Sequence, residues 1–471
     1  MDLTGFLKSR KTFIILIVLN FIGAVIMFYI FNSKVRGDAR TYFGLADGIL
    51  QGTYSYWYFL DHYYPDTFRN PGYPLFLAAI RIFTHSVIVV QVIQFLFYFG
   101  AVRLLFSILD LMFRDTMIIK NIFLMFLLSS IHIVSYTTAI LPEILVTFLL
   151  LLSIWIDLKL PSDRWKKYII LGFLYGFLFQ VRPVVLFLPF LIAILNYIKN
   201  RQSFPLFKNV VLLSIYMITM IPYGLWNKAN HGVFKITSLE GGAGVFHLGY
   251  WMFKLPDYYE VRYWGNYCTR EMIPLIDEKD REFNIKKFNA EWDEIDSALA
   301  PLLTAADTAM IKLKPGYISL FKTYNSNYVI KREQLLKEYT LKNIKSDLFY
   351  YFKVKCYTVA RLWVTGIPMR DFRPAGLIKK LNLMYPFLIT FITFITALIV
   401  IPISFFKYRP AMLPLTGILM IVLYFGIIHI PFAIQARYTI PVRFELMMMI
   451  AVSLYLLFFQ KEKVEIDNTG S

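Results

Sequence analysis

The sequence predicts an all-α polytopic membrane protein, and three observations support that class. Hydrophobic residues make up 58% of the chain, charged residues make up only 17%, and the mean hydropathy is +0.55. Apolar segments of about 20 residues, the length that an α-helix needs to cross the hydrocarbon core, recur along the chain. Basic residues gather in the short connections between those segments. Together these features are typical of a helical membrane protein and not of a soluble domain.

About ten segments are candidate spans, and the first lies close to the start of the chain. Residues 12–31 have the required length and are followed by no small-residue cleavage site, so we interpret them as a retained anchor and not as a signal peptide. The other candidates are 87–109, 121–139, 142–155, 168–181, 184–197, 210–226, 383–405, 412–430 and 438–459.

The positive charges predict the orientation of the spans, because Lys and Arg in short loops stay on the cytoplasmic side. In this count of spans, every basic cluster falls on the same side and both termini lie inside the cell. The clusters are Lys8 with Arg10 and Lys11, Arg114 with Lys120, Lys159 with Arg164, Lys166 and Lys167, Lys199 with Arg201 and Lys208, Lys407 with Arg409, and Lys461 with Lys463. We therefore interpret the net charge of +18 as a topology signal and expect no nucleic-acid partner.

A long polar segment divides the chain between the seventh and eighth candidate spans. We expect an N-terminal transmembrane module at 1–226 with a first external loop at 32–70, a mainly helical external segment at 227–380, C-terminal transmembrane helices at 381–460 and a cytoplasmic tail at 461–471. Both cysteines, Cys268 and Cys356, lie in the external segment, where they can form a disulfide or stay reduced, because their separation carries no spacing signature.

Within the external segment, residues 332–363 have the pattern of a basic amphipathic helix. Apolar residues recur there near the helical period, and lysines flank them. Such a helix can lie on a membrane surface that carries anionic headgroups, or it can pack on its own domain. The sequence leaves both interpretations open.

The first external loop combines a carboxylate with a proline-rich segment. Asp38 precedes residues 39–50, whose apolar positions fall on one helical face, so we expect an interfacial helix there with Asp38 at its N-cap. An aspartate in that position stabilises a helix by roughly 1 kcal/mol. Further along, Pro71 and Pro74 interrupt the pattern, and Gly72 between them is expected to allow a tight turn.

Several short segments, in order, resemble the integral-membrane glycosyltransferases of the GT-C class. The nearest resemblance is to the branch that contains the dolichyl-phosphate-mannose protein mannosyltransferases and the bacterial aminoarabinose transferase that modifies lipid A. The segments are Gly37-Asp38, the run from Arg69-Asn70-Pro71-Gly72-Tyr73-Pro74 to Ala78, Leu141-Pro142-Glu143, Arg182-Pro183, the glycine-rich stretch from Ser238 to Leu248, and Ala436-Arg437-Tyr438-Thr439-Ile440-Pro441.

The resemblance implies a GT-C fold and transfer of a sugar from a polyprenyl-phosphate-linked donor, with inversion, to a lipid, glycan or protein acceptor on the external face. It places the catalytic carboxylate on Asp38, as the general base that takes the acceptor's proton. The sequence has no P-loop or Rossmann glycine signature, which agrees with a donor that contains no nucleotide. We expect such a protein in the bacterial inner (plasma) membrane, in contact with membrane lipids.

Glu143 is the second candidate catalytic residue. It can orient the acceptor, help to bind a divalent cation or tune Asp38, and its alternative role is to interact with the dipole of the helix that it begins. His247 can ligate a metal together with Glu240, or it can be structural. No cofactor is certain from these residues, and a divalent metal is the only candidate, with Glu143 and His247 as weak ligands.

Four arginines are candidates for binding the donor phosphate, because a guanidinium matches phosphate oxygens in shape and stays charged. Arg182 and Arg437 are the first choices, and their alternative role is to reach the lipid headgroups. Arg69 and Arg40 are weaker candidates for the same role.

Substrate contacts are expected from Tyr73, His247 and Tyr438, which lie within the segments that carry the resemblance.

Two other classes of protein remain open. A polysaccharide polymerase or ligase with lipid-pyrophosphate substrates also has a large external loop and arginines, but it does not predict an acidic residue in the first loop followed by a Pro-Gly-Tyr-Pro segment. A secondary transporter would show an internal repeat and charges near the centres of its spans. Here no repeat is evident, and the candidate charges lie near span ends.

Overall fold

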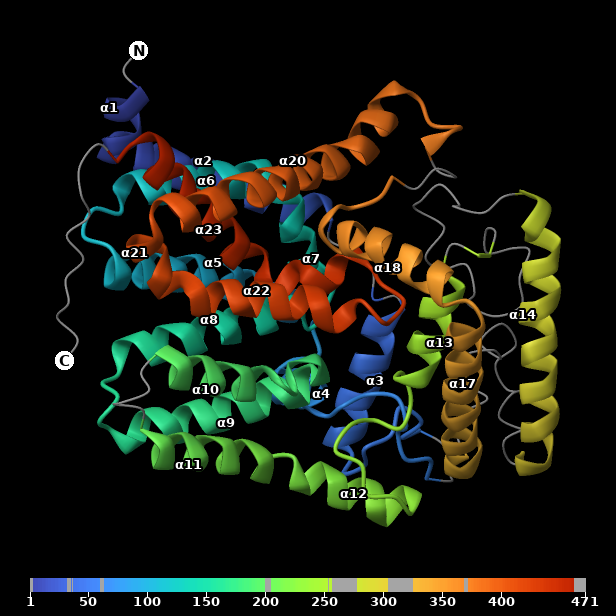
Figure 1. Cartoon of the computed structure of the whole chain (residues 1–471). Coiled ribbons are helices and arrows are strands. Elements are labelled where there is room, and N and C mark those ends of the chain that lie inside the picture. Colours follow the sequence, from blue (N-terminus) through green and yellow to red (C-terminus); the bar gives the residue numbers. More distant parts are fainter. Residues whose placement is uncertain are drawn as a thin grey trace.

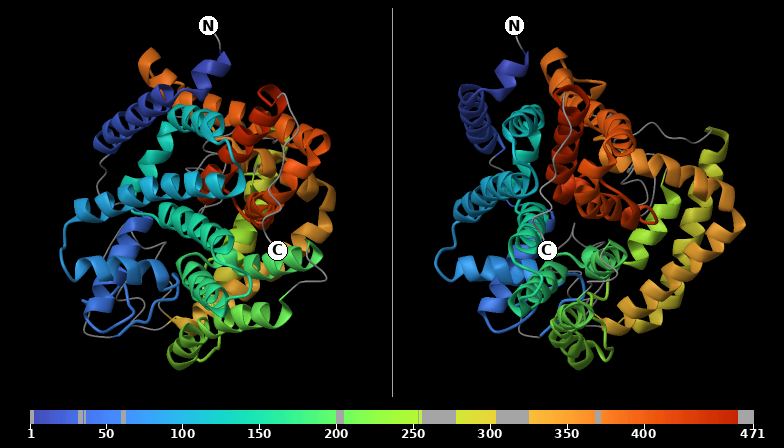
Figure 2. Two further views of the ribbon diagram at one scale, coloured as in Figure 1. Left: turned by 90° about the vertical axis from the view of Figure 1, so that its left-hand side faces the viewer. Right: turned by 60° about the vertical axis from the view of Figure 1, so that its left-hand side comes forward.

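The structure is a computed structural model that describes residues 3–31, 35, 37–59, 63–199, 205–252, 254–255, 278–303, 325–367 and 372–460. Within these ranges all regular structure is helical. The helices form a bundle with a lobe beside one of its ends (Figure 1 and Figure 2). We define the lobe as α13 (Ala243–Trp251), α14 (Glu278–Leu299), α17 (Ser326–Ser346) and α18 (Leu348–Trp363).

The bundle consists of an N-terminal and a C-terminal group of helices. The N-terminal group is α1 (Leu3–Lys8), α2 (Arg10–Ile30), α3 (Asp38–Leu50), α4 (Gly72–Arg81), α5 (Val87–Met112), α6 (Met117–Ser129), η1 (Ile131–Val134), α7 (Ser135–Thr138), α8 (Glu143–Lys159), α9 (Trp165–Val181), η2 (Pro183–Val185), α10 (Leu188–Lys199), α11 (Leu206–Ile218) and α12 (Ile221–His231). The C-terminal group is α20 (Leu377–Lys407), α21 (Arg409–Met412), η5 (Leu413–Leu415), α22 (Thr416–His429), η6 (Ala436–Val442) and α23 (Arg443–Phe458).

Among the described residues, 6 helical stretches are long and apolar enough to cross a membrane, or up to 7 if the pair Met117–Ser129 and Ile131–Thr138, bent by 70°, is one span. The 6 stretches are Arg10–Ile30, Val87–Met112, Leu206–His231, Leu377–Lys407, Arg409–His429 and Ala436–Phe458. These confirm a multi-pass helical membrane protein. The larger number of spans stays a prediction, because α8, α9 and α10 have only 17, 17 and 12 residues.

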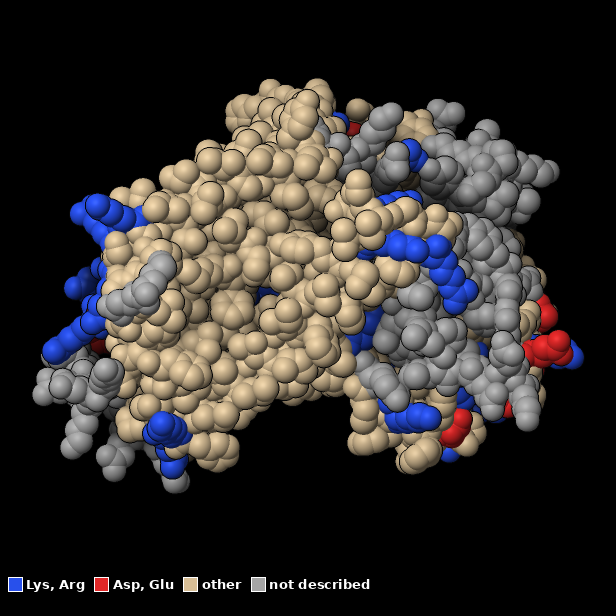
Figure 3. All heavy atoms as spheres, turned by 90° about the horizontal axis from the view of Figure 1, so that it is seen from above, with Lys and Arg blue, Asp and Glu red and all other residues tan. Residues whose placement is uncertain are grey.

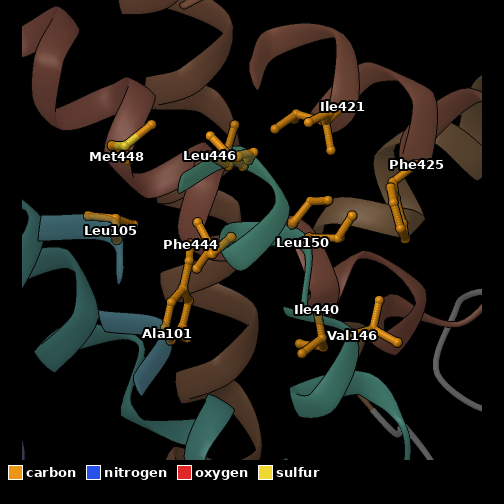
Figure 4. Close-up of a cluster of buried hydrophobic side chains, with 14 of the residues drawn as sticks. Ala101, Leu105, Val146, Leu150, Ile421, Phe425, Ile440, Phe444, Leu446 and Met448 are labelled. Atoms are coloured by element: carbon orange, nitrogen blue, oxygen red, sulfur yellow. The ribbon is translucent and has the colours of Figure 1, made fainter. Parts of the chain in front are cut away.

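The core of the bundle is built around α23. In the apolar part of Ala436–Phe458, which joins η6 and α23, 83% of residues are buried, against 17% in α2, so this stretch lies inside the bundle and α2 at its edge. Figure 4 shows how side chains from α5, α8, α22 and α23 point toward one another, with Leu105, Leu150, Phe425 and Phe444 among them. Because lipid is as apolar as these side chains, this close packing and not water exclusion holds such helices together.

Charged side chains are unevenly distributed over the surface. Figure 3 shows a broad face that is nearly free of them, with Lys and Arg at one end and charges of both signs at the other, near the lobe. A face of this kind suits contact with lipid. Helix α1 and the end of α23 lie at the same end of the bundle (Figure 1), as the predicted placement of both termini on one side requires.

The basic amphipathic segment is two helices and not one. It breaks at Asp347, whose carboxylate accepts a hydrogen bond from the backbone N–H of Tyr350 at 3.3 Å and so caps α18. Helix α17 packs on α13 and α14, and α18 packs on η6, α20 and α22. Helix α17 therefore packs on its own domain, which was one of the two interpretations left open by the sequence. Helix α18 instead turns Phe349 and Phe352 outward, with exposures of 83% and 71%. In α18, Cys356 is an exposed free thiol, and Cys268 lies outside the described residues.

Candidate functional site

The centre of the candidate site is the carboxylate of Asp38. Its Oδ1 accepts a hydrogen bond from Nη2 of Arg69 at 2.7 Å, and its Oδ2 accepts one from Nη2 of Arg437 at 2.8 Å. The predicted helix is present as α3, but the predicted N-cap role of Asp38 is wrong, since Gly37 holds the N-cap with a φ of 52° and Asp38 is the first helical residue. The carboxylate still lies in the first turn, where the helix dipole favours a negative charge.

The two arginines set the protonation of this carboxylate. Burial raises the pKa of Asp38, but the charges and hydrogen bonds of Arg69 and Arg437 outweigh burial and hold the pKa below its ordinary value. Asp38 is therefore ionised at neutral pH. A carboxylate that is bound by two cations is a weak base, so proton abstraction requires at least one guanidinium to move to another anion.

Arg69 lies against aromatic rings that fix its direction. Its guanidinium carbon is 4.9 Å from the centre of the Tyr42 ring, and Tyr42 packs edge-on against Tyr73 at 4.9 Å. Tyr73 is fully buried, and its hydroxyl donates to Oε1 of Gln94 at 2.7 Å. The prediction that Tyr73 contacts substrate is therefore not supported by its position. Tyr73 packs against the ring of Tyr42, and that ring in turn contacts the guanidinium of Arg69.

The Pro-Gly-Tyr-Pro segment begins a helix and forms no tight turn, which corrects the expectation for Gly72. Gly72 is the first residue of α4, and Pro74 lies in the first turn, where a missing N–H costs no helical hydrogen bond. The absence of a side chain matters here for a different reason. A Cβ on Gly72 would lie 2.4 Å from the backbone of Gln180 and of Val181, so only glycine lets α4 begin this close to the end of α9.

A second ion pair lies at the end of α9. Arg182, the C-cap of that helix, places Nη1 3.3 Å from Oε1 of Glu143, the first residue of α8. Glu143 is only 3% exposed, and its Oε2 has no hydrogen-bond partner. A buried carboxylate with one unpaired oxygen is costly unless a ligand completes it. Oε2 of Glu143 therefore has room for one further hydrogen-bond donor.

The ring of Tyr438 joins the two ion pairs. The guanidinium carbons of Arg182 and Arg437 are 5.4 Å and 5.9 Å from its centre, and His429 stacks on it at 5.0 Å. We call Asp38, Glu143, Arg69, Arg182 and Arg437 the ionic cluster. The structure thus brings together five of the predicted site residues, with Tyr438 between them, although they come from five different parts of the chain.

Arg40 does not join the ionic cluster. It is exposed, its Nε donates to the carbonyl of Val35 at 3.3 Å, and the carboxylate of Asp38 is bonded to Arg69 and Arg437 instead. As α3 continues from Asp38, the helix carries Arg40 onto another face.

His247 does not join it either. The predicted glycine-rich turn is largely helix α13, and His247 is fully buried in the lobe, with Nε2 3.1 Å from Oε2 of Glu291 and 3.2 Å from Nε1 of Trp251. Glu240, its predicted partner in metal binding, is bonded to Arg332. Among the residues that the structure describes, no group of three or more His, Cys, Asp and Glu could hold a metal ion. The position of His247 thus supports the structural interpretation.

Asp66, which was not among the predicted site residues, shapes the loop that carries Arg69. Its Oδ2 accepts hydrogen bonds from the backbone N–H groups of Phe68 at 3.0 Å and Arg69 at 2.8 Å, a turn in which an aspartate binds the backbone two and three residues on. The signal was an aspartate three positions before Arg69. Burial raises the pKa of Asp66 to about 7.

No family model, no curated protein and no solved structure matches this chain. The resemblance to the GT-C class therefore rests on the short segments alone. The ionic cluster is the feature of the structure from which a function can be argued.

Proposed function

We propose that this protein is a membrane glycosyltransferase of the GT-C class that moves a sugar from a polyprenyl-phosphate-linked donor to a lipid, glycan or protein acceptor, with Asp38 as general base. The observation that carries the proposal is the carboxylate of Asp38 held between Arg69 and Arg437, in contact through Tyr438 with Arg182. We also propose that the protein lies in a bacterial inner membrane and that its site faces the outside of the cell.

The reaction needs a base and an anion site next to each other. A hydroxyl or amine of the acceptor attacks the anomeric carbon, and Asp38 takes its proton. The bond between that carbon and the phosphate oxygen breaks, and the electron pair stays on the phosphate. Guanidinium groups stabilise the charge that develops there. Displacement from the side opposite the phosphate inverts the anomeric carbon.

The same arginines can bind the donor phosphate and control the basicity of Asp38. When the donor phosphate binds to Arg437 or Arg182, it draws a guanidinium away from a carboxylate, because the phosphate oxygens compete for the same N–H groups. The loss of one cation raises the basicity of Asp38. Donor binding would in this way prepare the base for the acceptor.

The charge of the ionic cluster favours a donor with one phosphate. Three guanidiniums and two carboxylates leave a single net positive charge. A sugar linked through one phosphate is a phosphodiester with a single negative charge, whereas a lipid pyrophosphate carries more. This balance favours a polyprenyl-monophosphate donor over the pyrophosphate substrates of a polymerase or ligase.

The test is sugar transfer by the purified full-length protein in lipid nanodiscs. Candidate polyprenyl-phosphate sugars and cell-envelope acceptors are supplied to wild type, Asp38→Asn and Asp47→Asn. Asp47 is the matched control, because it lies on the same helix and pairs with Arg81 at 2.6 Å. We expect Asp38→Asn to lower the transfer rate by a factor on the order of 100 to 10,000 and Asp47→Asn to retain it.

Equal transfer by wild type and Asp38→Asn would contradict the role of Asp38. Substrate movement across sealed vesicles without a new glycosidic bond would instead show a transporter.

A further inference from the structure

The segment that carries Arg69 is held from the lobe side by a continuous set of hydrogen bonds. Thr67 accepts from the backbone N–H of Glu240 at 2.9 Å through its carbonyl and donates from its hydroxyl to Oε1 of Glu240. Asn70 accepts from the backbone N–H of Ser238 at 2.9 Å through Oδ1. Residues 67–70 and 238–240 therefore run beside each other as one unit.

A buried ion pair fixes that unit to helix α17. Nη2 of Arg332 donates to Oε2 of Glu240 at 2.7 Å, and the side chains are only 16% and 7% exposed. Both carboxylate oxygens of Glu240 are thus engaged, one by Thr67 and one by Arg332. The next residue, Glu333, accepts from the backbone N–H of Ala243 at 2.9 Å, so α17 also holds the start of α13.

A second link from α17 reaches the same segment. Nδ1 of His231 is 2.7 Å from Oγ of Ser326, the first residue of α17, and Nε2 of His231 is 3.2 Å from the carbonyl oxygen of Asp66. The carbonyl of Arg69 itself accepts from the hydroxyl of Tyr223 at 3.0 Å. Hydrogen bonds from outside the loop therefore hold residues on both sides of Arg69.

We propose that Glu240 and Arg332 are positioning residues of the site, which hold the segment 66–70 so that the Arg69 guanidinium reaches Asp38. This inference rests on the proposed function for its effect on transfer. The physical reason is that a guanidinium placed 1 Å away from its position loses its directed hydrogen bond, and misplacement of that size lowers catalytic rates by up to roughly 100-fold. The lobe, which contributes no residue to the ionic cluster, would thereby determine its geometry.

The variants follow from these contacts. Glu240→Ala removes both links of the carboxylate, and Glu240→Gln keeps an acceptor for Thr67 but loses the charge that binds Arg332. Asp347→Asn is the matched control, because it breaks another ion pair of the lobe, Lys254–Asp347 at 2.8 Å, and keeps a side chain that can cap α18.

The first measurement is hydrogen exchange of peptides that cover residues 63–70, followed by mass spectrometry of the full-length protein in nanodiscs. Exchange is expected to be about tenfold faster in Glu240→Ala than in wild type, less accelerated in Glu240→Gln, and unchanged in Asp347→Asn. This readout needs no substrate. Unchanged exchange in Glu240→Ala overturns the proposal, even if sugar transfer by the wild type is found.

The second measurement is a double-mutant cycle on transfer. Glu240→Ala is expected to lower kcat about tenfold in the wild-type background and to add less than twofold in the Arg69→Gln background, because it acts through Arg69. Equal losses in both backgrounds would show a general structural effect and overturn the positioning role. If the wild type transfers no sugar, the proposed function fails. Hydrogen exchange alone then tests whether Glu240 and Arg332 hold the segment 66–70 in place.

Discussion

A methyl group on Gly72 is expected to force apart the start of α4 and the end of α9. In Gly72→Ala the new Cβ would lie 2.4 Å from the carbonyl carbon of Gln180 and from the backbone nitrogen of Val181. Neither atom belongs to a flexible side chain, so the two backbones must separate by about 1 Å to reach ordinary contact. Overpacking of this kind typically costs about 1–3 kcal/mol.

The assay is thermal unfolding of the purified protein in detergent, with Gly417→Ala as the control. Gly417 lies in α22 with nothing within 4 Å of an added Cβ, so alanine there is expected to be neutral or to stabilise by up to about 1 kcal/mol. The melting temperature of Gly72→Ala should fall below that of both wild type and the control. If Gly72→Ala and Gly417→Ala have the same melting temperature, α4 does not begin as close to the end of α9 as the structure shows.

Two further predictions concern charge. Since burial raises the pKa of Asp66 to about 7, the folded protein keeps a proton there that the unfolded chain loses near pH 4, so stability should fall by about 2–3 kcal/mol from pH 5 to pH 8. Asp66→Asn should make the fall smaller by this amount, and melting curves of both proteins at both pH values check it; an equal fall in the variant would contradict the assignment. Arg182→Lys should raise the KM for the donor about tenfold, since a lysine lacks the planar fork, whereas Arg164→Lys at the other end of α9 should not. Kinetics over a range of donor concentrations distinguish the two, and equal KM values would count against phosphate binding by Arg182.

Patterns of neighbouring residues in the sequence were enough to predict several of the helices. The apolar face of residues 39–50 predicted α3, and long apolar runs predicted multi-pass spans such as α2 and α5, because helical periodicity and length are local properties. The break at Asp347 was missed, since the apolar pattern continues across it and only a capping hydrogen bond marks the new helix.

The site residues show where local patterns stop being informative. Asp38, Glu143, Arg69, Arg182 and Arg437 were all candidates by residue type and through the segments that resemble the GT-C class, and they do meet in the structure. His247 was a candidate on the same grounds, and it lies buried in the lobe. The residues next to each candidate in the sequence do not indicate whether it joins the ionic cluster or is buried in the lobe. The reason is that each contact joins segments that are far apart in the chain.

The sequence by itself determined that the chain is a helical membrane protein with a carboxylate in its first loop and arginines near span ends. Only the tertiary structure decided that Asp38 is held by two arginines, that Glu240 and Arg332 reach the segment before α4, and that Gly72 serves close packing and not a turn. The physical reason is that hydropathy and helical period are set by adjacent residues. Ion pairs and backbone contacts depend on how distant helices pack, and no local pattern encodes that packing.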